Sequence, residues 1–250
     1  MKIISLNTWG GSVKDRLVPF LVNHVPIDAW FFQEVFNSSK QLERGYIVPL
    51  SDYTPDSFLF ETLSRSLPSY TRYFSQTTKE VFGLAAFIDP KIELFERGEI
   101  LVARGEETEG GDNLYRKLQW FEIVLDGKKL LLMNTILTHR PQGKEDTQKR
   151  IEQSEKIINL MNMFDCPKIL VGDFNLKPDT ESIRMIEKSG MRNLIKEYNI
   201  TSTRSELYKK EVKFADYIFV SPEIQVNEFK VMSDVVSDHL PLYLDFEIKN

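Results

Sequence analysis

The sequence has little cysteine and no long apolar segment. Cys166 is the only cysteine among 250 residues, so the chain cannot build a disulfide framework of its own. It comes just before the apolar run at residues 169–171, a setting typical of a buried and unreactive thiol. The longest apolar runs, such as residues 130–133, are far too short to cross a bilayer. We therefore expect neither a membrane span nor a disulfide-stabilised secreted domain.

The start of the sequence also lacks a targeting signal. Met1 and Lys2 are followed at once by the strand-like run at residues 3–6, without an apolar leader or a cleavage site of small residues. A cytoplasmic protein is the resulting expectation, although a processed mature chain would begin in the same way. A monomer is the default expectation for its oligomeric state.

Positive charge is not in excess. Acidic residues number 37 against 32 basic residues, which gives a formal net charge of −5. Proteins that bind nucleic acid by broadly neutralising its phosphates are usually basic. Acidic residues gathered at a metal site, beside a local basic rim, would give the same balance. The charge therefore argues only mildly against a nucleic-acid substrate.

Strand-like stretches dominate the chain. They are short, rich in Val, Ile, Leu and Phe, and separated by turn residues. Asp126-Gly127 predicts a tight turn that joins two of them into a hairpin. We predict strands at residues 2–6, 29–33, 70–75, 84–88, 92–103, 118–125, 129–137, 168–172, 214–220, 225–232 and 242–248.

Helical patterns are fewer. Apolar residues at helical spacing predict the longest helix at residues 146–163. Shorter helices are predicted at residues 14–25, 58–67 and 179–189, with Asp179 as the N-cap of the last. Polar stretches at residues 104–113 and 140–147 predict surface loops. No linker or repeat divides the chain, so we expect one α+β domain over residues 1–250.

Acidic and amide residues recur where apolar strands begin or end. A carboxylate is costly to bury inside a strand, but at a strand end it can face a cleft and hold a cation. Taken singly, each such residue is more often a cap, a turn residue or a solvated acid. The positions are Asn7, Glu34, Asp173, Asn175, Asp216 and Asp238-His239.

The residues around these positions resemble the successive motifs of the endonuclease/exonuclease/phosphatase superfamily, which includes deoxyribonuclease I. Order and spacing match from residue 5 to residue 243. The resemblance implies a four-layer α/β/β/α sandwich of two mostly antiparallel sheets flanked by helices, with the active site at one end of the sheets. The matching phrases are Leu6-Asn7-Thr8-Trp9, Gln33-Glu34-Val35, Gly172-Asp173-Phe174-Asn175, Asp216-Tyr217-Ile218 and Ser237-Asp238-His239-Leu240-Pro241.

The resemblance implies a site for Mg²⁺ or Mn²⁺. Glu34 and Asp238 would supply carboxylate oxygens to the metal, and Asn7 a neutral oxygen. Such a sparse set suits Mg²⁺, because this ion keeps several waters and takes only one or two carboxylates. The metal would polarise a phosphoryl oxygen and stabilise charge on the leaving oxygen.

The same resemblance implies the catalytic residues. Asp173 would orient or deprotonate the attacking water, and Asn175 would donate a hydrogen bond to a phosphate oxygen. His239 would donate to the developing negative charge. Asp216 would hold this histidine and favour its charged form.

One position departs from the family pattern, and two further residues match it less specifically. Many members carry a histidine where this chain has Ile136, which can neither donate a proton nor a hydrogen bond. His139 either replaces it, through a bulged or longer strand, or is a loop histidine, because strict alternation puts the two positions on opposite faces. Arg116 opens a strand where some relatives place a phosphate-contacting arginine.

Three functions follow as hypotheses. The first is a divalent-metal-dependent phosphodiesterase whose substrate is a phosphoester in DNA or RNA, and hence a nuclease. The second is a phosphatase or a phospholipid or inositol phosphoesterase. The third is a catalytically impaired phosphate-binding module, for which Ile136 is the only support.

Overall fold

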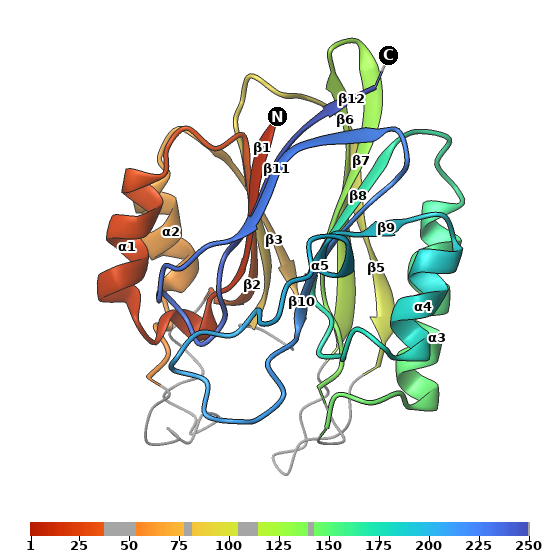
Figure 1. Ribbon diagram of the computed structural model, residues 1–250. Coiled ribbons are helices and arrows are strands. Elements are labelled where there is room, and N and C mark those ends of the chain that lie inside the picture. The colour runs from red at the N-terminus through yellow and green to blue at the C-terminus, as the bar shows by residue number, and fades with distance from the viewer. Residues whose placement is uncertain (38–53, 78–81, 105–114, 140–142, 250) are drawn as a thin grey trace.

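The computed structural model describes residues 1–37, 54–77, 82–104, 115–139 and 143–249. In this part of the chain two six-stranded sheets pack face to face, and helices cover the outer face of each (Figure 1). The predicted four-layer α+β sandwich is therefore confirmed. Both termini lie at the same end of the sandwich, at the top of Figure 1. The predicted loops at residues 104–113 and 140–147 lie partly outside the described residues.

The first sheet combines strands from both ends of the chain. Its strands are β1 (Lys2–Asn7), β2 (Ala29–Phe36), β3 (Thr71–Gln76), β4 (Phe82–Ile88), β11 (Ile224–Val231) and β12 (Leu242–Ile248). They lie in the order β11-β12-β1-β2-β4-β3. The central pair β1–β2 is parallel and the other pairs are antiparallel.

The second sheet comes from the middle of the chain. Its strands are β5 (Glu93–Ala103), β6 (Arg116–Leu125), β7 (Lys128–Ile136), β8 (Lys168–Asp173), β9 (Arg192–Asn193) and β10 (Asp216–Val220). They lie in the order β5-β6-β7-β8-β10-β9. Again one central pair, β7–β8, is parallel and the others are antiparallel. Asp126 and Gly127 both have positive φ, as the predicted hairpin turn requires.

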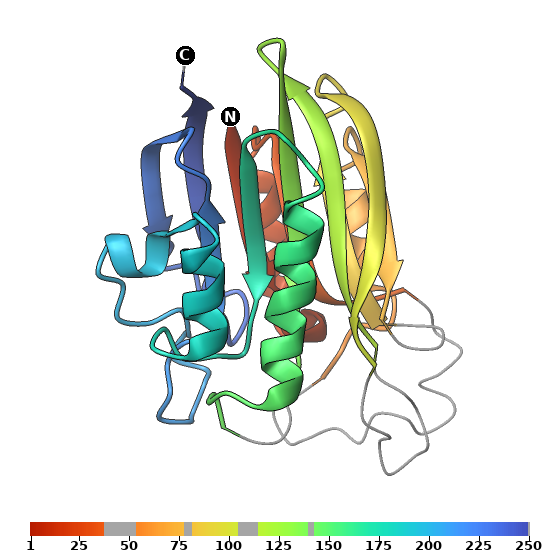
Figure 2. The ribbon, with the colours of Figure 1, turned by 90° about the vertical axis from the view of Figure 1, so that its right-hand side faces the viewer.

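The helices form the two outer layers. Helices α1 (Lys14–Asn23) and α2 (Leu59–Ser66) cover the first sheet. Helices α3 (Gln148–Met161) and α4 (Glu181–Lys188) cover the second sheet and face the viewer in Figure 2. All four match predicted helices. The sequence patterns missed the 3₁₀ turn η1 (Trp9–Gly11), β9 and α5 (Leu194–Glu197), which are too short to show a period. No helix in the described ranges is long and apolar enough to span a membrane.

Strand β2 explains how the layers are held together. Phe31 points into the core between the two sheets, whereas Trp30 and Phe32 point to the core under α1 and α2. All three side chains are fully buried. A strand with both faces covered reads as a continuous apolar run, which is how this segment appears in the sequence.

A polar contact joins the sheets near the end of this strand. The Gln33 amide donates to Asn134 Oδ1 at 2.7 Å, and the Asn134 amide donates to Gln119 Oε1 at 3.2 Å. All three side chains are buried. Hydrogen bonds between buried amides fix one relative position of the two sheets. The next residue after Gln33 is Glu34, so this contact also positions a predicted metal ligand.

Cys166 is half-buried rather than fully buried and packs against the main core. Burial raises the pKa of its thiol, which keeps it protonated and unreactive at neutral pH.

The N-terminus of α4 differs from the prediction that Asp179 caps it. Thr180 is the N-cap residue, and its side chain makes no capping hydrogen bond. Asp146, from the segment before α3, accepts from the backbone N–H groups of Glu181 at 2.6 Å and Ser182 at 3.0 Å. Capping preferences consider only residues that are adjacent in sequence. They therefore cannot identify a cap that a distant segment supplies.

This cap generates a stability prediction. We expect Asp146→Ala to lower the free energy of unfolding by about 1 kcal/mol, since two helix N–H groups lose their acceptor. Asp179→Ala is the matched control and should change it by less than about 0.5 kcal/mol. Urea unfolding of both variants measures the difference. Equal losses would contradict the assignment.

The stabilisation by Asp146 should also depend on pH. Partial burial raises the pKa of this carboxyl, but hydrogen bonds from Ser182 and Glu181 outweigh burial and lower the pKa below its ordinary value of 3.8. A lowered folded-state pKa stabilises the protein above the unfolded pKa, and the gain is lost as pH falls through the folded pKa. The difference between Asp146→Ala and the parent should therefore shrink in acid.

Candidate active site

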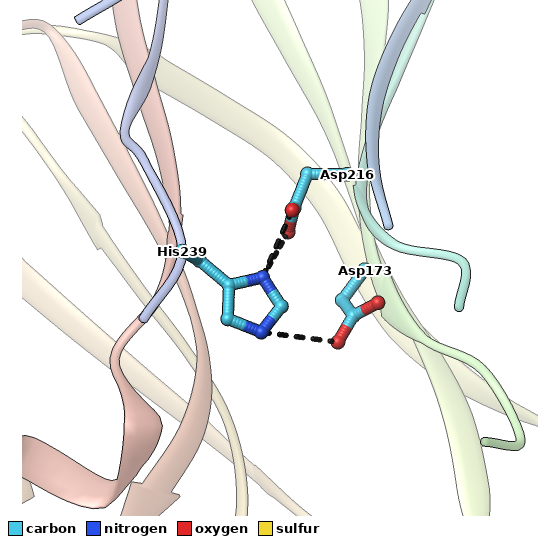
Figure 3. A group of neighbouring side chains, drawn as sticks. All are labelled: Asp173, Asp216 and His239. Carbon is cyan, nitrogen blue, oxygen red and sulfur yellow. Dashed lines mark hydrogen bonds and ion pairs between the residues drawn. The ribbon is translucent and has the colours of Figure 1, made fainter. Parts of the chain in front are cut away.

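The site lies at the end of the sandwich opposite the termini, where several strands begin or end. Asn7 is the last residue of β1 and Asp173 the last of β8, while Asp216 is the first of β10. Asp173 and Asp216 are direct partners across the antiparallel β8–β10 pair. His239 reaches them from the segment before β12, in the other sheet (Figure 3).

The turn after β8 explains the sequence Gly172-Asp173-Phe174-Asn175. A Cβ at Gly172 would lie 2.0 Å from the carbonyl oxygen of Thr135, so the close passage of β7 requires glycine. Asp173 Oδ1 accepts from the backbone N–H of Asn175 at 2.9 Å. Asn175 has φ of 54°, a conformation that asparagine tolerates better than most residues. Each residue type therefore has a local reason.

Glu34 is placed by an irregularity in β2. The β2–β4 register shifts between Phe32 and Val35, and Glu34 has φ of 56°. A bulge of this kind re-aims a side chain. The Glu34 carboxylate lies 3.0 Å from the Asn7 amide nitrogen. Burial, reinforced by Asp238 and Asp173, raises the pKa of Glu34 to about 7 although the hydrogen bond from Asn7 lowers it. A bound cation would stabilise its charged form.

Asp216 and His239 form a buried pair (Figure 3). His239 Nδ1 lies 2.8 Å from both carboxylate oxygens of Asp216. Thr203 donates its hydroxyl to Asp216 Oδ2 at 2.9 Å. With Nδ1 facing Asp216, the other ring nitrogen, Nε2, faces Asp173 Oδ2 at 3.9 Å and Asp238 Oδ1 at 3.7 Å. The ring is thereby oriented toward the other carboxylates.

The surroundings of His239 act against the expectation that Asp216 favours its charged form. Burial lowers the pKa of His239 to about 3, and the positive charge of Arg204 lowers it further. Asp238 and Asp173 act in the opposite direction but do not compensate. Burial also raises the pKa of Asp216, to about 6. Burial thus disfavours the charged form of each member of the pair, while the 2.8 Å contact between Nδ1 and the carboxylate holds them together.

Asn7 acts here as a donor. Its amide nitrogen donates to Glu34 Oε1 at 3.0 Å and to Asp173 Oδ2 at 2.9 Å. Its oxygen accepts from the backbone N–H of Trp9 at 3.0 Å, which fixes the orientation of the amide. In this orientation Asn7 holds two carboxylates together, whereas the sequence predicted that it offers an oxygen to a metal.

The residues fit a hard divalent cation. Asp173, Asp216 and His239 have ligand atoms within 4.8 Å of one another. Asp238 Oδ1 is buried and has no hydrogen-bond partner among the described residues. An unpaired buried carboxylate oxygen is costly unless a cation satisfies it. Since His239 Nδ1 already bonds Asp216, oxygen atoms of Asp238 and Glu34 are the better donors for Mg²⁺ or Mn²⁺.

Two buried cations in the site were missed by the sequence analysis. Arg204 pairs with Asp238 Oδ2 at 2.7 Å, and Lys144 donates to Asn175 Oδ1 at 3.2 Å. Burial lowers the pKa of Lys144 to about 8, although Asp173 raises it. Both lie in polar stretches whose sequence resembles that of exposed loops. Only the folded structure shows that they lie next to the motif residues.

The remaining predicted residues separate into a buried and an exposed group. Arg116, the first residue of β6, is buried, and its charge interacts with Glu34 and Asp173. Ile136 is also buried and pairs with Asp173 in the β7–β8 register. His139 follows the end of β7, and its side chain is exposed. The structure therefore brings Arg116 to the carboxylates and places His139 at the surface.

Comparisons with known proteins agree with this architecture. A mannosyl-6-phosphatase from Bacteroides thetaiotaomicron is 18% identical, covers 99% of this chain and 100% of its own, and superposes with a TM-score of 0.72. The human Nocturnin catalytic domain with bound sulfate is 16% identical, with 100% and 93% covered and a TM-score of 0.70. TDP2 from D. rerio, complexed with a single-stranded DNA product, is 18% identical, with 99% and 98% covered and a TM-score of 0.66. No curated protein sequence matches significantly.

At these identities the structural neighbours establish a shared fold. The sequence itself matches the model of the endonuclease/exonuclease/phosphatase family over residues 4–239, nearly the whole chain. Fold, motif order and family match agree, and the chain belongs to the endonuclease/exonuclease/phosphatase family of hydrolases.

Proposed function

We propose that this protein is a phosphodiesterase that uses Mg²⁺ or Mn²⁺, and that its substrate is a nucleic acid. One observation carries the proposal: carboxylates and a histidine from distant segments meet at one end of the sheets, and one buried carboxylate oxygen there has no partner in the described part of the chain. TDP2, which has the same fold, was crystallised with single-stranded DNA product.

The metal would be held by Glu34 and Asp238. The Glu34 carboxylate interacts electrostatically with Asp238 and Asp173, and Asp238 Oδ1 lies 3.7 Å from His239 Nε2. When bound, the ion supplies charge stabilisation at the phosphoryl and leaving oxygens. Asn7 keeps Glu34 and Asp173 in place through its two hydrogen bonds.

The catalytic steps fall to the residues around this pair. Asp173 orients or deprotonates the attacking water, and His239 contacts the phosphate through Nε2 while Asp216 holds the ring. Asn175 donates to a phosphate oxygen. Its Oδ1 accepts from Lys144 and its amide nitrogen donates to the Leu137 carbonyl at 3.4 Å. An amide nitrogen carries two hydrogens, so one serves the phosphate. Arg116 adds positive charge beside Glu34 and Asp173.

A phosphomonoesterase is the second candidate. Three buried cations, Arg116, Lys144 and Arg204, surround the site and would balance the additional charge of a monoester dianion. A mannosyl-6-phosphatase shares the fold. A catalytically impaired phosphate-binding module is the remaining reading.

Metal removal tests the proposal directly. We expect the protein with Mg²⁺ to cleave a labelled oligonucleotide or bis(p-nitrophenyl) phosphate, to lose activity in EDTA, and to recover it with excess Mg²⁺. Full activity in chelator would refute the metal mechanism. Hydrolysis of monoesters but of no DNA, RNA or lipid phosphodiester would establish the phosphatase, and no hydrolysis with retained phosphate binding would establish the binding module.

Asp173→Asn tests the water-orienting residue. The substitution preserves the size of the side chain and removes its charge, so turnover should fall by about 10²-fold or more while circular dichroism stays unchanged. Asp179→Asn makes the same chemical change at an exposed position and should leave turnover unaltered. Parent-like turnover in Asp173→Asn would remove this residue from the mechanism.

His139→Ala tests the histidine beyond β7. An exposed side chain at the edge of the site is in a poor position for proton transfer at its centre, so we expect less than a tenfold loss of turnover. A loss of about 10²-fold or more, measured on the same substrate, would instead show that His139 supplies the acid–base or electrostatic catalysis missing at Ile136.

A further inference from the structure

Arg204 has an unusual environment for a buried arginine. Its side chain is 5% exposed and pairs with Asp238 through one terminal nitrogen, at 2.7 Å. Its Nε, also buried, has no hydrogen-bond partner among the described residues. Arginine is always charged in proteins, so an unsatisfied N–H on a buried guanidinium is costly.

Arg150 shows how this chain satisfies an arginine with a structural role. It is also buried, and its Nε donates to the carbonyl of Thr138 at 3.1 Å. Its terminal nitrogens donate to the carbonyls of Glu145 and Gly143. The guanidinium of Arg150 therefore ties together the segment before α3. No described residue accepts a hydrogen bond from Nε of Arg204, so this N–H can donate to a bound ligand.

The guanidinium of Arg204 is nevertheless held firmly. Its central carbon lies 4.2 Å from the centre of the Tyr208 ring, and Asp238 fixes one end. The backbone of Arg204 forms an antiparallel bridge with His239, and the neighbouring Thr203 bonds Asp216. Arg204 is thus fixed next to the Asp216–His239 pair, with an N–H donor in a preset direction.

In the ion pair of Arg204 and Asp238, each residue has one buried polar atom without a hydrogen-bond partner among the described residues. Within the described ranges, Nε of Arg204 has no hydrogen-bond acceptor and Oδ1 of Asp238 has no hydrogen-bond donor. An anion would satisfy the first atom and a cation the second. A phosphate bound beside a divalent metal supplies both at once, and the planar fork of arginine matches phosphate geometry.

We propose that Arg204 is a phosphate-binding residue, whose Nε–H donates to an oxygen of the substrate phosphate while Asp238 holds the metal. The inference rests on the proposed function, since it places the phosphate of that reaction. Arg204 then serves two groups: it pairs with Asp238 on one side and contacts the phosphate on the other.

The experiment compares Arg204→Lys with the parent. Lysine keeps the charge next to Asp238 but lacks the fork, so it should preserve a purely structural role and lose the phosphate contact. In saturating Mg²⁺, isothermal titration with inorganic phosphate should show an affinity at least about tenfold weaker in Arg204→Lys. Mn²⁺ affinity, measured by electron paramagnetic resonance, should stay within twofold. Arg184→Lys, an exposed arginine on α4, is the matched control and should behave as the parent in both.

A second measurement needs no variant. In the ¹⁵N-labelled parent, the Nε–H signal of Arg204 should shift on addition of inorganic phosphate with Mg²⁺ and should exchange more slowly with water. An unmoved signal, or unchanged phosphate affinity in folded Arg204→Lys, overturns the inference. If the parent hydrolyses phosphoesters despite such a result, the proposed function stands without it. If phosphate binding depends on Arg204 but no phosphoester is hydrolysed, the proposed function fails and this inference stands.

Discussion

The burial of several carboxylates in one small volume is the constraint on which the site depends. Like charges at this separation in a medium of low dielectric repel strongly unless cations and hydrogen bonds offset them. The protein offsets them in part with Arg116, Lys144 and Arg204. The raised pKa values of Glu34 and Asp216 show that burial is not fully compensated by these groups. A divalent cation would supply the positive charge that these carboxylates still lack.

The fold makes this concentration of charge possible. Each sheet has one parallel pair at its centre, β1–β2 and β7–β8, and these strands deliver their carboxyl ends to the same edge. The Gln33–Asn134 hydrogen bond fixes the two sheets against each other beside that edge. The large apolar core behind it supplies the stability that the charged end lacks. The apolar length of the strands thus stabilises the fold, and the strand ends carry the residues of the site.

Local sequence patterns predicted most of the fold, because strands and helices of ordinary length leave a period in the chain. The hairpin at Asp126-Gly127 and the long helix α3 are examples. The prediction was wrong at the start of α4, whose cap Asp146 comes from another segment. It also missed β9 and α5, since two and four residues cannot show a period. The errors therefore had two sources, an interaction between distant segments and elements too short to show a period.

The sequence by itself determined the family and the residues at the strand ends, because Gly172, Asp173 and Asn175 are required by local backbone geometry as well as by chemistry. Tertiary structure alone decided how deeply His239 is buried and which residues Asn7 and Arg204 contact. The reason is physical: desolvation and Coulomb interactions depend on distance and burial. Neither is set by the spacing of residues along the chain.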